Sequence, residues 1–313
     1  MSLDRSTPLR VAVVQAASVL FDREASIDKG CALIAEAAAA GAQLIVFPEA
    51  FVSAYPRGLT FGAPVGSRSA EGRELFARYW EQAVELPSPS VERLSAAARA
   101  AQAWVVIGIV ERSTTGGRGT LYCSTLYLGP DGAVLGVHRK LKPTAAERVV
   151  WGEGDGSTLT VVDTPFGRVG GLICWEHYMP LARMAMYERG VDLWCAPTAD
   201  ARPTWQATMQ HLACEGRCFV LSANQYVTRS MYPPDLPGRD ALREQPEVMC
   251  RGGSAIYSPF GDLLAGPLYD AEGILYATCD LGEIVRGRFD LDVTGHYARP
   301  DVFHFGVRVP ANE

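Results

Sequence analysis

Three segments of the sequence place a residue capable of acid–base or nucleophilic chemistry directly after an apolar run. Glu49 follows LIVFP, Lys140 follows AVLGVHR and Cys174 follows RVGGLI. A cysteine thiol is mostly protonated at neutral pH, so a nucleophilic cysteine needs a base to take its proton or a cation to stabilise its thiolate. A carboxylate and an ammonium group can supply these two functions. The three residue types together are therefore suited to covalent catalysis by a cysteine.

Each of these residues also has a purely structural interpretation. Glu49 could be a surface charge or the start of a helix, and the basic cluster around Lys140 is typical of a solvated face. Cys174 is one of eight cysteines, and free cysteine most often fills a core as a small apolar residue. Cys174 differs from the other seven because charged and aromatic residues follow it directly. A strand-to-turn junction there would expose the thiol beside backbone N–H groups, as a nucleophile with an oxyanion hole requires.

Taken together, the three segments resemble the signature regions of the nitrilase superfamily. The matching motifs are FPEAF at 47–51, HRKLKPT at 138–144 and GLICWEHYMP at 171–180, in the family's order and at suitable separations. The segments YPRG at 55–58, WGEGDG at 151–156, EGRCFV at 215–220 and GHYARP at 295–300 resemble the nitrilase branch in particular. The resemblance spans nearly the whole chain, and three motifs in order are far more specific than one.

The resemblance implies a role for each matching residue. Glu49 matches the general base, Lys140 the catalytic lysine and Cys174 the nucleophile of a nitrilase, which hydrolyses nitriles to carboxylic acid and ammonia without a metal or organic cofactor. We favour Lys140 over Lys142 because it completes the family's Arg-Lys pattern. Glu147 matches a second glutamate near the site and would keep Lys140 charged, although a surface pair with its neighbour Arg148 is the alternative.

The substrate is less well specified than the nucleophile. By motif position, the candidate wall residues of the substrate site are Tyr55, Thr144, Trp151, Trp175, Pro197 and Thr198. Their aromatic share favours aromatic or arylaliphatic nitriles, but tryptophan and tyrosine fill cores as often.

Other members of the superfamily keep other functions open. Aliphatic amidases and carbamoylases use the same three residues, but amidase-type members commonly place Asp two positions after the cysteine, where this chain has Glu176. Cyanide-degrading relatives and, more remotely, a non-catalytic assembly scaffold are further alternatives. Nitrilases commonly form homo-oligomers, and residues 230–246 and the tail after Pro300 are the segments we expect at such contacts.

Strand-like and helix-like stretches alternate along the chain. Apolar runs such as LIVF and LWCA are typical of strands buried on both faces. The pattern predicts a layered α/β fold, and the resemblance implies a four-layer α-β-β-α sandwich, with residues 1–313 forming one domain that ends in a short tail from about residue 300. Residues 230–246 contain four prolines and predict a long surface loop. The predicted helices are 24–40, 71–84, 91–102, 181–189 and 203–216, and the predicted strands are 11–16, 44–47, 104–110, 121–128, 133–138, 159–162, 169–173, 193–196, 219–223, 255–257, 263–265 and 275–279.

The composition narrows the class of protein. The chain has 313 residues, of which 48% are hydrophobic and 20% charged, values typical of a soluble globular protein. A net charge of −6 argues against nucleic-acid binding. The polar N-terminal residues and the lack of a run of ~20 apolar residues predict neither a secretory signal nor a membrane span, hence a cytoplasmic protein with reduced thiols. Cys214 and Cys218 have helical spacing, but no second ligand pair accompanies them, so no metal site is expected.

Overall fold

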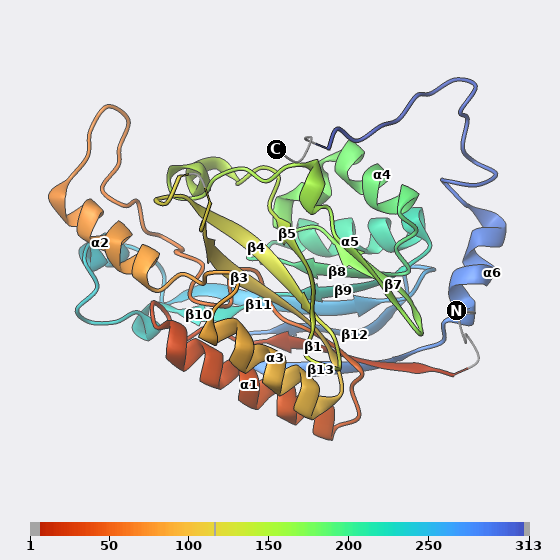
Figure 1. Cartoon of the computed structure of the whole chain (residues 1–313), viewed down its shortest axis with the longest axis horizontal. Helices are drawn as coiled ribbons and strands as arrows, with labels where there is room; N and C mark the ends of the chain where they lie inside the picture. The colour runs from red at the N-terminus through yellow and green to blue at the C-terminus, as the bar shows by residue number, and fades with distance from the viewer. Residues whose placement is uncertain (1–6, 116, 310–313) are drawn as a thin grey trace.

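The chain forms two β-sheets that pack face to face, with helices on both outer faces (Figure 1). The computed structural model describes residues 7–115 and 117–309, so the polar N-terminal residues 1–6 and the last four residues of the tail lie outside the described part. Within the described residues, the first sheet has six strands in the order β13-β1-β2-β3-β4-β5. These strands are β1 (Leu9–Gln15), β2 (Leu44–Val46), β3 (Trp104–Arg112), β4 (Leu121–Leu128), β5 (Val134–Arg139) and β13 (Gly273–Cys279).

The second sheet has the order β10-β11-β9-β8-β7-β6, and β12 pairs with β11. Its strands are β6 (Val161–Thr164), β7 (Gly167–Gly171), β8 (Leu193–Pro197), β9 (Phe219–Ala223), β10 (Tyr226–Thr228), β11 (Val248–Tyr257) and β12 (Leu263–Tyr269). The described helices are α1 (Arg23–Ala39), α2 (Ala70–Glu81), α3 (Pro89–Ala101), α4 (Pro180–Glu188), α5 (Pro203–Gly216) and α6 (Gly282–Asp290). The first three begin at side-chain caps, from Asp22, Ser69 and Ser88.

Side chains that alternate along the central strands pack into different layers. In β1, Val11 and Val13 lie in the apolar layer between the two sheets, whereas Ala12 and Val14 pack with α1 and α3. Strand β8 follows the same rule, with alternate residues facing the other sheet or the helices α4 and α5. Strands buried on both faces explain why their sequences are apolar without polar alternation. The predicted four-layer α-β-β-α sandwich is confirmed.

Every predicted helix and strand overlaps a helix or strand of the structure, with ends that differ by a few residues. Helix α6, strand β10 and the first half of β11 were not predicted. Helix α6 has nine residues, two of them glycine, and buries only Ile284 and Gly287, so its helical signal is short. Strand β11 contains Gly252 and Gly253, both at positive φ, and such a pair in a sequence is more typical of a turn. The glycine is required here because a Cβ on Gly252 would lie 2.2 Å from the amide of Gln15.

Residues 230–246 are irregular, as predicted, but they are not merely a surface loop. They include two short 3₁₀ turns, and Tyr232, Leu236 and Leu242 are almost fully buried in a cluster with Cys174. The Tyr232 hydroxyl donates to the carbonyl of Arg57 at 2.9 Å. The prediction of a plain surface loop was therefore wrong in this respect, because apolar side chains spaced irregularly among prolines gave no periodic signal.

Candidate active site

Glu49 lies three residues beyond the end of β2, in a turn that also holds Ala50 at a φ of 48°. Its side chain is fully buried. Oε1 accepts hydrogen bonds from Lys140 Nζ at 2.7 Å and from the Cys123 thiol at 3.4 Å, whereas Oε2 has no partner among the described residues. Burial raises the pKa of Glu49, against the opposing effect of Lys140. The free oxygen of this carboxylate is therefore a stronger proton acceptor than an exposed glutamate.

Lys140 follows β5 directly and is 1% exposed. Its backbone N–H donates to the carbonyl of Cys123 on the neighbouring strand β4, which fixes the direction of the side chain. Nζ donates to Glu49 and to Glu147, each at 2.7 Å. Burial alone lowers the pKa of Lys140, but the adjacent acidic groups outweigh it and raise the pKa well above its usual value. The adjacent acidic groups therefore favour the charged form of Lys140, whereas Lys142 is half exposed and pairs with Glu153.

Glu147 lies in a 3₁₀ turn, Ala145–Val149, which follows Pro143 and returns the chain toward Lys140. Besides Lys140, Oε2 accepts from the backbone N–H of Thr144 at 2.6 Å, and Oε1 accepts from the Tyr55 hydroxyl at 2.6 Å. The predicted proximity of Glu147 to Lys140 is thus present in the structure, and the alternative pair with Arg148 is not.

Cys174 begins the 3₁₀ turn Cys174–Tyr178, three residues after β7 ends. Its φ of 50° lies in the left-handed region, where a non-glycine residue is strained and is often functional. The thiol is 4% exposed and accepts a hydrogen bond from Thr198 Oγ1 at 3.3 Å. Burial raises the pKa of Cys174 well above its usual value, the carboxylates of Glu49 and Glu147 add to the rise, and Lys140 opposes it. The resting thiol is therefore protonated and needs a base.

Glu176 connects the segment that bears the cysteine to the segment that bears the lysine. Its carboxylate is fully buried and accepts from the backbone N–H groups of Ile173 at 2.6 Å and Leu141 at 2.7 Å. It also lies 2.9 Å from Nε2 of the buried His138. Burial raises the pKa of Glu176, but His138 and the two backbone donors outweigh it and lower the pKa below its usual value. The charged carboxylate thus fixes the relative positions of the two reactive segments.

His177 is held as a neutral imidazole behind Cys174. Trp194 Nε1, which can only donate, lies 2.9 Å from His177 Nε2, so Nε2 must be the unprotonated nitrogen. Nδ1 then donates to the carbonyl of Cys174 at 2.6 Å. Burial lowers the pKa of His177 to about 4. The ring therefore fixes the Cys174 turn without contributing charge.

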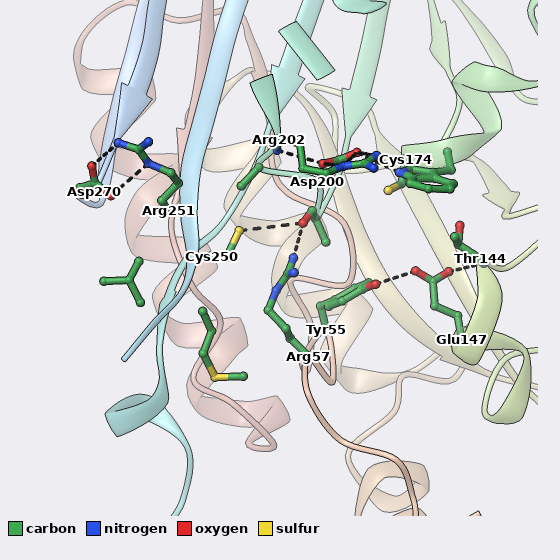
Figure 2. Close-up of a pocket in the computed structure, with 15 residues that line it drawn as sticks. Tyr55, Arg57, Thr144, Glu147, Cys174, Asp200, Arg202, Cys250, Arg251 and Asp270 are labelled. Atoms are coloured by element: carbon green, nitrogen blue, oxygen red, sulfur yellow. Dashed lines mark hydrogen bonds and ion pairs between the residues drawn. The ribbon is translucent and has the colours of Figure 1, made fainter. Parts of the chain in front are cut away.

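The thiol opens onto a cavity of about 650 Å³ (Figure 2). Figure 2 shows Tyr55 and Glu147 joined on one side, with Asp200 and Arg202 near Cys174 and the pair Arg251–Asp270 at the far side. The lining residues are Tyr55, Arg57, Thr144, Glu147, Cys174, Trp175, Ala199, Asp200, Ala201, Arg202, Val248, Met249, Cys250, Arg251 and Asp270. Small-molecule sites in proteins have volumes of roughly 300–1,000 Å³.

Three of the six expected wall residues line this cavity: Tyr55, Thr144 and Trp175. The other three lie behind the wall. Trp151 is buried with its ring edge-on to Tyr55 at a centroid distance of 5.7 Å, Pro197 is buried at the end of β8, and Thr198 is buried against the Cys174 thiol. These three side chains do not face the cavity: Thr198 contacts the thiol from within the fold, and Trp151 packs against Tyr55 from behind.

Two comparisons of sequence place the chain among known proteins. A model of the family described as carbon-nitrogen hydrolase matches residues 10–289. The chain belongs to this family. It is 50% identical to a bifunctional nitrilase/nitrile hydratase of Nicotiana tabacum, over 98% of the chain and 88% of that protein. It is 53% identical to an aliphatic nitrilase of Sinorhizobium fredii, over 96% of both.

Solved structures of this carbon–nitrogen hydrolase family share the fold. Nit3 of Saccharomyces cerevisiae, a member of branch 10 of the nitrilase superfamily, has a TM-score of 0.71 and 22% identity, covering 93% of this chain and 96% of its own. An amidase of the nitrilase superfamily from Nesterenkonia has a TM-score of 0.68 and 19% identity, and the match covers 95% of this chain and 99% of the amidase chain. At these identities the likeness concerns the fold alone. The resemblance to the nitrilase superfamily seen in the three motifs is confirmed.

Several residues of the site in this carbon–nitrogen hydrolase were not predicted. Glu176 and His138 lie inside the three sequence motifs, so the sequence marks these positions. It does not show that the two side chains contact each other. Cys123 and Gln225 had no local signal, because each reaches Glu49 across a long sequence separation. The Gln225 side chain donates to the carbonyl of Glu49 at 2.8 Å. Within the described residues, no group of three or more His, Cys, Asp or Glu side chains is placed to hold a metal ion, and no helix is long and apolar enough to cross a membrane.

Proposed function

We propose that this protein is a nitrilase that hydrolyses organic nitriles to carboxylic acid and ammonia, with Cys174 as nucleophile, Glu49 as base, Lys140 as the cation of the site and Glu147 as its partner. The observation that supports it most directly is the buried cluster in which one ammonium joins two carboxylates beside a strained cysteine. Relatives at about 50% identity over nearly the whole chain are named as nitrilases.

The first half of the proposed reaction forms a covalent bond to the nitrile carbon. The unpartnered Oε2 of Glu49 accepts the thiol proton as Sγ of Cys174 attacks. The electron pair of the C≡N bond moves to nitrogen, which takes the proton from Glu49 to give a thioimidate and restore the Glu49 carboxylate. Lys140 and the backbone N–H of Trp175 are the proposed donors to the developing negative charge. Thr144 and Trp175, with Tyr55, form the proposed wall around the substrate.

The second half releases the products. A water molecule, deprotonated by Glu49, adds to the thioimidate carbon to give a tetrahedral intermediate. Loss of ammonia from this intermediate leaves a thioester on Cys174, and a second water molecule releases the carboxylic acid and restores the thiol. One nitrile and two water molecules thus give one acid and one ammonia. Loss of the thiolate from the same intermediate in place of ammonia would give an amide, so the product ratio depends on which group is protonated.

A panel of aromatic, arylaliphatic and aliphatic nitriles, with acid, amide and ammonia measured separately, tests the proposal. We expect ammonia release from nitriles, and none from the Cys174→Ala variant, whose circular dichroism and melting temperature should match the wild type. Turnover of primary amides without turnover of nitriles would instead support an amidase. Turnover of cyanide alone would support a cyanide-degrading enzyme, and an inert folded chain would support an assembly scaffold.

The surface around α4 supports a further part of the proposal, that the protein is a homo-oligomer. Leu181, Tyr297 and Phe303 are 72%, 61% and 73% exposed and border a groove between α4 and the C-terminal segment. Exposed apolar groups gathered in this way are typical of interaction surfaces. Light scattering coupled to size exclusion should give at least a dimer, and Leu181→Glu should shift it toward monomer. A monomeric wild type would contradict this.

The compartment and the class of ligand complete the proposal. The eight cysteines are free thiols, which suits the reducing cytoplasm. The net charge of −6 favours small-molecule substrates over nucleic acid. Retention of all eight thiols in protein isolated from the cytosolic fraction, measured by thiol alkylation, tests the compartment.

A further inference from the structure

Arg57 lines the same cavity as Cys174 and is held there by contacts of its backbone and its side chain. It is half-buried, and its Nη2 donates to the carbonyl of Ala199. The guanidinium carbon lies 5.3 Å from the centre of the Tyr55 ring. The hydroxyl of Tyr232 holds the backbone carbonyl of Arg57. Figure 2 shows the Arg57 side chain between Tyr55 and Cys250.

Arg57 differs from the other arginines of the cavity because no carboxylate among the described residues pairs with it. Arg202 and Arg251 also line the cavity, but each forms an ion pair, with Asp200 and Asp270 respectively. Over residues 7–115 and 117–309, the guanidinium of Arg57 has no carboxylate within ion-pair distance, and its hydrogen-bond partners are the carbonyl oxygen of Ala199 and the sulfur of Cys250. Most of its N–H groups are therefore available to a ligand.

A half-buried cation without a counter-ion is unfavourable unless a ligand supplies the opposite charge. A guanidinium binds a carboxylate through two parallel hydrogen bonds, which are among the strongest in proteins. The carboxylates of the cavity, Glu147, Asp200 and Asp270, are already paired with cations, so the single charge of Arg57 matches a singly charged anion better than a doubly charged phosphate.

We propose that Arg57 binds a carboxylate at the end of the substrate remote from the reacting carbon, so that the preferred substrates are nitriles that carry a carboxylate group. The identity of the reacting group rests on the proposed nitrilase function, whereas binding of a carboxylate at Arg57 does not. A cavity of about 650 Å³ that contains both Arg57 and Cys174 holds a short chain with a nitrile at one end and a carboxylate at the other.

The kinetic test compares ω-cyanocarboxylates of increasing chain length with the matching ω-cyanocarboxamides, which have the same size and no charge. For the best chain length, the wild type should give a kcat/KM for the carboxylate at least about 10-fold above that for the carboxamide. Arg57→Met should lower this ratio by about 10- to 100-fold, as expected for loss of a charge-assisted hydrogen bond. Arg57→Lys should retain part of the ratio.

Arg251→Met is the matched control, because Arg251 lines the same cavity but is already paired with Asp270. In Arg251→Met, the ratio of kcat/KM for the carboxylate to that for the carboxamide should stay within about 2-fold of the wild-type ratio, since a neutralised cation adds little to recognition of an anion. If Arg57 only tethers its loop to Ala199, Arg57→Met will lower kcat/KM equally for the carboxylate and the carboxamide. The ratio of the two values will then be unchanged. That result would overturn the proposal, as would a wild-type ratio near or below one.

A binding measurement keeps the proposal testable without turnover. Pentanoate, which has no nitrile, should bind to the wild type in calorimetric titration at least about 10-fold more tightly than pentanamide, and Arg57→Lys should weaken that preference. Equal binding of the two would refute the carboxylate site even if nitriles are hydrolysed. Preferential binding of pentanoate without turnover of any nitrile would support the site and refute the nitrilase assignment.

Discussion

Replacing Glu176 by glutamine tests whether the buried carboxylate positions the cysteine and lysine segments. The change keeps the shape of the side chain but replaces one acceptor oxygen by an NH₂ group. In the structure the two carboxylate oxygens accept from Ile173 N, Leu141 N and His138 Nε2 at 2.6, 2.7 and 2.9 Å. Whichever way the amide turns, its NH₂ group will face a backbone N–H that has lost its acceptor.

The size of the effect follows from the hydrogen bonds that the substitution breaks. A hydrogen bond to a charged group contributes about 1.5–3 kcal/mol, and a buried donor left without a partner costs about 1–3 kcal/mol. Breaking one side of a buried ion pair costs about 3–5 kcal/mol in total. We therefore expect Glu176→Gln to lower the free energy of unfolding by about 3–5 kcal/mol. Because a displacement of about 1 Å at a reacting group can cost roughly 100-fold in rate, kcat should fall by a similar factor.

The assay is urea unfolding followed by tryptophan fluorescence, with ammonia release measured on the same preparations. Asp163→Asn is the control, since Asp163 is 85% exposed in its pair with Arg168 and should change the unfolding free energy by less than about 0.5 kcal/mol. A Glu176→Gln variant within about 1 kcal/mol of the wild type, with unchanged kcat, would refute the positioning role.

Three further predictions concern the site itself. Lys140→Met should lower kcat/KM by about 100- to 1,000-fold, whereas Lys142→Met should stay within about 2-fold in the same ammonia assay; similar losses in both would contradict the assignment of Lys140. Tyr55→Phe removes the 2.6 Å hydrogen bond to Glu147 and should lower kcat about 10-fold in steady-state kinetics, and an unchanged kcat would show that this contact is dispensable. The pKa of His177 is lowered to about 4 from an ordinary 6.5, so the unfolded chain takes up this proton at a higher pH than the folded chain. The stability that neutral His177 contributes is present above about pH 6.5 and is lost as the pH falls toward 4, which lowers the unfolding free energy by up to about 3 kcal/mol. In urea titrations at several pH values, His177→Asn should flatten this part of the profile of unfolding free energy against pH. An unaltered slope would contradict the prediction.

The fold was predictable where burial and periodicity agree. Strands such as β2 and β8 are apolar along their whole length because both faces are covered, and helices α1 and α3 have capping residues at their starts. Helix α6 has nine residues, two of them glycine, and β11 contains a glycine pair, so neither gave a clear local signal; both are stabilised by contacts with distant parts of the chain. Local patterns carry no information about such tertiary contacts.

The residues of the site could be predicted only where they lie in the sequence motifs. Glu49, Lys140, Glu147 and Cys174 come from segments that end near one another, and the structure brings their side chains together. The substrate wall was harder to predict, because it combines the segment around Arg57 with β11 and the residues after β8. These segments meet only through the packing of the two sheets, and only three of the six expected wall residues line the cavity.

The covalent bond between Cys174 and the substrate is the central claim. Rapid mixing with a nitrile, acid quenching within the first turnovers and intact-mass measurement test it most directly. We expect a protein population heavier by the acyl or imidoyl group of the nitrile, with the adduct mapped to the peptide that contains Cys174, and no adduct in Cys174→Ala. An adduct on another cysteine such as Cys123, or full ammonia release by Cys174→Ala, would contradict it.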